Sequence, residues 1–74
     1  MRKIRFTGWN KKMNKIKFIH LLNEQAKLSL KESKDIKDRI VGGEKIDILV
    51  SDDKINILIS ESIKFGVSAE EISK

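Results

Sequence analysis

Polar and apolar residues alternate in two short segments of the chain. In the first segment, residues 2–9, Ile4 and Phe6 fall on one side of the alternation, which predicts a half-buried strand. Residues 45–50 repeat the pattern and predict a second strand. The apolar side of this second strand consists of Ile46, Ile48 and Val50.

Between these segments the apolar residues follow the spacing of helices. Asn14 is a suitable N-cap for a first helix. Its inner stripe is predicted to be Ile16, Ile19, Leu22 and Ala26, widened by Phe18 and Leu21. After a turn at residues 27–28, Ser29 and Glu32 form a capping box that starts a second helix, which ends at Gly42-Gly43. The predicted inner face of the second helix is Leu30, Ser33, Ile36, Ile40 and Val41.

A third helix is predicted between Ser51, as its N-cap, and Gly66. Its predicted inner stripe is Ile55, Leu58, Ile59, Ser62 and Ile63. Residues 67–72 are compatible with a short strand or with the cap of a last helical turn. With the strand, residues 1–74 form a single α+β domain of order β-α-α-β-α-β, with three helices packed on one face of a small antiparallel sheet.

The charge is distributed unevenly along the 74 residues, whose formal net charge is +5. The first 39 residues hold 12 Lys and Arg against four acids, a balance of +8, whereas the rest hold four Lys against seven acids, a balance of −3. A basic half suggests an anionic partner, either a protein or a nucleic acid. The lysines could equally serve only to keep the surface solvated.

Composition excludes several classes of protein. The chain has no Cys, hence no disulfide framework, no thiolate zinc site and no cysteine nucleophile. Its longest apolar runs are three residues, far short of the ~20 that a membrane span requires. The basic start is not followed by the apolar segment of a signal peptide. We therefore expect a soluble, cytoplasmic domain without a membrane partner.

Residues that could support catalysis are few. His20 is the only histidine, and its helical neighbour Glu24 could complete at most a two-ligand metal pair. The adjacent acids at 52–53 and 70–71 do not face each other on a helix or a strand. The sequence therefore predicts a protein that is not an enzyme and that holds no metal and no cofactor.

Two runs of the chain resemble the C-terminal domain of the bacterial ribosomal stalk protein of the large subunit. They are NKIKFIHLLN at residues 14–23 and LSLKESKDI at residues 28–36. The order of predicted elements also agrees over nearly the whole chain. The resemblance implies a non-catalytic docking module that uses the exposed face of the first two helices. Carried over by position, that face comprises Lys15, Ile16, Ile19, His20 and Lys34, while Asn23 replaces a basic residue of the family.

These observations lead to two hypotheses about function. The first is a stand-alone protein-binding module, a regulator or inhibitor of the kind found on mobile elements. It would bind an acidic protein surface through the positions just named together with Lys31 and Trp9. The alternative is weak RNA or DNA binding by the basic N-terminal half. The sequence leaves open whether Trp9, Ile16 and Ile19 belong to the core or to an interface.

Overall fold

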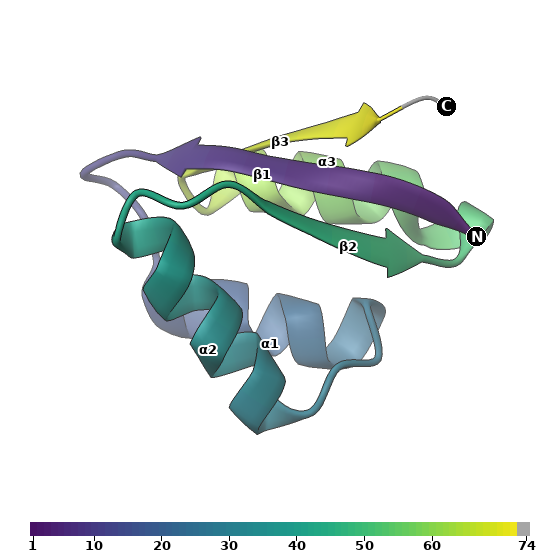
Figure 1. The fold of residues 1–74 in the computed structure, drawn as a ribbon, viewed down its shortest axis with the longest axis horizontal. Coiled ribbons are helices and arrows are strands. Elements are labelled where there is room, and N and C mark those ends of the chain that lie inside the picture. Colours follow the sequence, from purple (N-terminus) through teal and green to yellow (C-terminus); the bar gives the residue numbers. More distant parts are fainter. Residues whose placement is uncertain (73–74) are drawn as a thin grey trace.

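The computed structural model describes residues 1–72 and contains three strands and three helices (Figure 1). The elements are β1 (Arg2–Trp9), α1 (Lys15–Gln25), α2 (Leu30–Val41), β2 (Ile46–Val50), α3 (Ile55–Lys64) and β3 (Val67–Ile72). A single 3₁₀ turn, η1 (Asp52–Lys54), precedes α3. The predicted α+β class and the order β-α-α-β-α-β are confirmed, and residues 67–72, which the sequence left open, form a strand.

The sheet has the order β2-β1-β3, and both pairs of strands are antiparallel. β1 is therefore the central strand, and its apolar side faces the helices. Ile4 lies opposite Ile48 of β2, and Phe6 lies opposite Ala69 of β3. All three helices cover the same face of the sheet, as predicted (Figure 1). A bulge between Phe6 and Gly8 shifts the register of β1 against β3.

The core lies between this face and the helices. Its centre is an edge-to-face contact between Phe6 of β1 and Phe18 of α1, whose ring centroids are 5.3 Å apart at 89°. Both rings are fully buried, as are Ile40 of α2 and Leu58 of α3. Each helix thus contributes a large side chain to one common cluster.

The predicted inner stripe of α1 was wrong at its first position. Ile16 is 69% exposed, and Ile19 is only half-buried. The side chains of α1 that enter the core are Phe18, Leu21 and Leu22. The helix has apolar residues around most of its circumference, so spacing alone did not decide which of them face the sheet.

Two further residues assigned to inner faces lie on the surface. Leu30 of α2 is 54% exposed, and Ile63 of α3 is 57% exposed. Ser33 and Ser62 are fully buried, as predicted, and the hydroxyl of neither has a hydrogen-bond partner within residues 1–72.

The predicted helix caps are largely confirmed. The Asn14 side chain accepts a hydrogen bond from the Lys17 amide at 3.1 Å. At the start of α2, Ser29 Oγ accepts from the Glu32 amide, and the Glu32 carboxylate accepts from the Ser29 amide, which completes the capping box. Ser51, however, makes no capping hydrogen bond, because η1 separates it from α3.

Candidate binding surface

The loop between β1 and α1 is fixed against the end of α3. The amide of Asn10 donates to the carbonyl of Gly66 at 2.9 Å, and the amide of Asn14 donates to the carbonyl of Phe65 at 2.8 Å. Within the loop, the Asn10 side chain accepts from the Lys12 amide at 2.8 Å. Asn14 then caps α1, so the first turn of that helix has a defined position beside the end of β1.

Gly66 is required for this arrangement. Its φ is +89°, a conformation that residues with a side chain rarely adopt. A Cβ atom at this position would also lie 2.6 Å from the Cα of Met13. The close approach of the two backbones therefore depends on the absence of a side chain.

Trp9 and Lys15 are brought together by this loop. Trp9 is the last residue of β1 and is 40% exposed. The Nζ atom of Lys15 lies 5.6 Å from the centroid of the Trp9 ring, within the range of a cation–π interaction. Trp9 is thus a partly exposed aromatic side chain with a cation held over its ring.

Ile16 follows Lys15 in the first turn of α1 and is exposed. Residues three and four positions apart on a helix are surface neighbours, so Ile16 adjoins both Ile19 and His20. His20 is exposed and lines a shallow hollow between α1 and α3 that also includes Phe65. We call the residues Trp9, Lys15, Ile16 and Ile19 the Trp9 surface.

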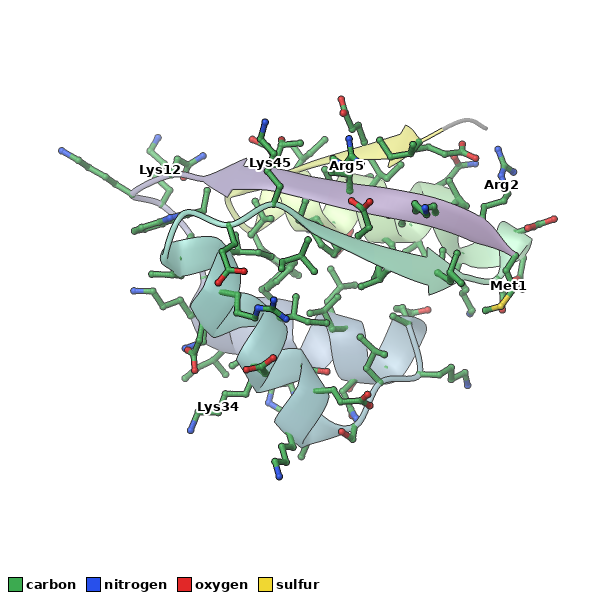
Figure 2. The ribbon with its side chains drawn as sticks, in the orientation of Figure 1. Met1, Arg2, Arg5, Lys12, Lys34 and Lys45 are labelled. Atoms are coloured by element: carbon green, nitrogen blue, oxygen red, sulfur yellow. The ribbon has the colours of Figure 1, made fainter. Side chains whose placement is uncertain are left out.

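Lys31 and Lys34 occupy different surroundings. Both are exposed on α2, where they line a shallow hollow together with Glu32, Asp35 and Asp38. Figure 2 shows Lys34 on the side of α2 that faces away from the sheet. The sequence-based set of binding residues is therefore divided between an apolar and basic region around α1 and a region of mixed charge on α2.

Unpaired lysines are concentrated in the segment of the chain that carries the Trp9 surface. Four lysines lie just before α1 or in its first turn, namely Lys11, Lys12, Lys15 and Lys17. None of them forms an ion pair with another residue of the described range 1–72. No acidic residue occurs between Trp9 and Glu24 in the sequence. Lys11, Lys12 and Lys17 were not among the predicted site residues, although this acid-free run was visible in the sequence.

Arginines on the sheet are paired with carboxylates instead. Arg5 on the outer face donates two hydrogen bonds to Asp47, at 2.7 and 3.0 Å. Arg2 donates likewise to Glu71, with the second bond at 2.8 Å. The hydrogen bonds and positive charge of Arg5 lower the pKa of Asp47, and in α2 the ammonium group of Lys37 lowers the pKa of Asp38 in the same way.

Two further observations bear on the predicted absences. Within residues 1–72, no group of three or more His, Asp or Glu side chains is arranged to hold a metal ion. In the same range, no helix has the length and apolar character needed to cross a membrane.

No family model, curated protein or solved structure matches the chain. The resemblance to the ribosomal stalk domain therefore remains a prediction from residues 14–36.

Proposed function

We propose that this chain is a non-catalytic interaction module that binds a protein with an acidic surface through the Trp9 surface. The observation that carries the proposal is the 69% exposure of Ile16 in the first turn of α1, the turn that also carries Lys15 and its contact with Trp9. An isoleucine and a tryptophan that are buried only on binding would contribute hydrophobic free energy, and tryptophan is enriched among residues that dominate interfaces.

The four unpaired lysines of residues 11–17 define the chemistry of the partner. Because they lack carboxylate partners within residues 1–72, their charge is available to acidic side chains of another protein. Complementary charge accelerates association and disfavours basic partners. The partner is therefore expected to present acidic residues around an apolar site that accepts Ile16 and Trp9.

Nucleic acid is the second candidate, and the acid-free run of lysines after Trp9 favours it. The exposed isoleucine argues for a protein instead, because single strands are bound mainly by stacking bases on aromatic side chains. Among the Phe and Trp side chains of residues 1–72, only Trp9 is exposed.

Affinity purification of the tagged chain from its native host tests the proposal. The comparison uses the wild type, Ile16→Asp, and the matched control Ile63→Asp, which alters an isoleucine of similar exposure on α3. We expect the wild type and the control to retain one stoichiometric protein at ~300 mM salt after nuclease treatment, and Ile16→Asp to lose it.

Recovery of nucleic acid alone would contradict the proposal. In that case binding should weaken steeply with salt, with a slope of about −0.7 to −0.9 for each phosphate contacted. Equal retention of the protein by Ile16→Asp and the wild type would also contradict it, because the binding site would then lie elsewhere.

A further inference from the structure

The outer edge of β2 has no partner strand in the described part of the chain. The sheet order places β2 at one edge, beside β1 alone (Figure 1). The backbone amide and carbonyl groups on the other side of an edge strand are available to pair with a further strand. β2 is five residues long, which is close to the usual length of a strand.

The two edges of the sheet differ in how well they are protected from such pairing. β3 carries the adjacent acids Glu70 and Glu71, and its pairing with β1 contains the bulge. β2 has the sequence Ile-Asp-Ile-Leu-Val, without proline and without a bulge in its pairing with β1. Its single charge, Asp47, is already bound to Arg5, and Leu49 is 56% exposed on the outer face.

We propose that β2 pairs with β2 of a second copy of this chain, antiparallel and with a two-fold axis at Ile48. This inference concerns a different surface from the proposed function and does not depend on it. The pairing joins two three-stranded sheets into one of six strands. Ile46 then lies opposite Val50, and Asp47 opposite Leu49, so every residue of the strand has a partner.

Side-chain chemistry selects this register. A shift of the axis by half a residue would set inner-face residues opposite outer-face residues, which the pleat does not allow. An axis at Asp47 would place two carboxylates directly opposite each other, which is destabilising. An axis at Leu49 would leave Ile46 opposite Asp52, beyond the end of the strand. With the axis at Ile48, the two Leu49 side chains are diagonal neighbours on the outer face.

The size of the contact indicates a weak dimer. Pairing along one short strand falls at the low end of interface areas, below ~1,200 Å² in total. We therefore expect a dissociation constant on the order of 100 μM, which corresponds to a modest binding free energy.

Analytical ultracentrifugation of the 74-residue chain from ~10 μM to ~1 mM tests this, because that range spans the expected dissociation constant. The wild type should change from monomer to dimer. Leu49→Asp places a carboxylate directly opposite Asp47 of the second copy, once on each side of the axis, and should weaken the dimer at least ~10-fold. The control Ile63→Asp makes the same change at an equally exposed residue on α3 and should leave the dimer intact. Circular dichroism establishes that both variants are folded.

A second measurement tests the register. Because the chain has no cysteine, Asp47→Cys and Leu49→Cys chains can be mixed and oxidised. Opposite positions on antiparallel strands have the spacing of a disulfide, so the mixed disulfide should exceed both homodisulfides. If the mixed disulfide and the two homodisulfides formed in the proportions expected from random pairing, the proposed register would be overturned. A wild type that stays monomeric up to ~1 mM, or equal weakening by Ile63→Asp, would overturn the proposed dimer.

Discussion

The outer face of the sheet and the Trp9 surface both carry exposed basic residues, but these residues differ in what they contact. On the sheet, Arg5 donates both of its hydrogen bonds to Asp47 of the neighbouring strand. Around the Trp9 surface, Lys15 contacts an aromatic ring, and no carboxylate within residues 1–72 pairs with it. Charges satisfied within the chain stabilise it modestly, whereas unpaired charges beside exposed apolar groups are available to another molecule.

The largest expected difference in stability is between the buried and the exposed side of α1. Phe18→Ala removes a fully buried ring from the contact with Phe6 and should reduce the free energy of unfolding by ~3–5 kcal/mol. Ile16→Ala should change it by no more than ~0.5 kcal/mol, because the residue is exposed. Urea unfolding followed by circular dichroism measures both. If Ile16→Ala strongly reduced the free energy of unfolding, the Trp9 surface would be part of the core.

The next largest effect on stability is expected at Gly66, which holds the β1–α1 loop in place. Gly66→Ala combines a positive φ with a Cβ only 2.6 Å from Met13, and should cost about 3 kcal/mol and displace the loop. Gly43→Ala is the matched control: its φ is +97°, but no atom lies within 4 Å of the added Cβ, so the loss should be about 1 kcal/mol. Thermal unfolding compares the two. Equal losses would show that the contact with Met13 is unimportant.

Asp47 on the sheet gives the smallest effect, and that effect depends on pH. Its pKa is lowered in the folded state by Arg5, so the pair stabilises the fold above the carboxyl pKa of the unfolded chain, about 3.9. This contribution is lost as the pH falls through the lower, folded pKa. Asp47→Asn should therefore be less stable than the wild type at neutral pH, and the difference should disappear in acid. Unfolding curves of both proteins between about pH 2 and pH 7 test this. If the difference in stability between Asp47→Asn and the wild type did not depend on pH, the charge of Asp47 would not be its source.

Much of the fold could be predicted from local patterns. The alternation around Ile4 and Phe6 and the capping box at Ser29 depend on neighbouring residues, and both were predicted correctly. The errors at Ile16, Leu30 and Ile63 have a different origin. Each of these residues belongs to a stripe of positions at helical spacing, and only the packing of whole helices decides which of several apolar positions faces the sheet.

The candidate site was less accessible to sequence reasoning. Trp9 and Lys15 were named separately, but their contact depends on a loop held by Phe65 and Gly66, more than fifty residues further along the chain. Spacing within one segment cannot show such a contact. Lys31 and Lys34 were grouped with Lys15 through the family resemblance, and the acids between them on α2 give them a different setting.

The central position of β1 has a consequence for how the chain acquires its structure. Lys3 pairs with Leu49 on one side and with Ile72 on the other, so the sheet joins residues that lie far apart in the sequence. Contacts between residues so distant in sequence slow folding, because the long loops between them must be closed first. Helices α1 and α2, which are joined by a tight turn, can pair early. During synthesis, β1 must wait for β3 before the sheet is complete, and until then the backbone edge of β1 that pairs with β3 remains open to chaperones and to other unfinished chains.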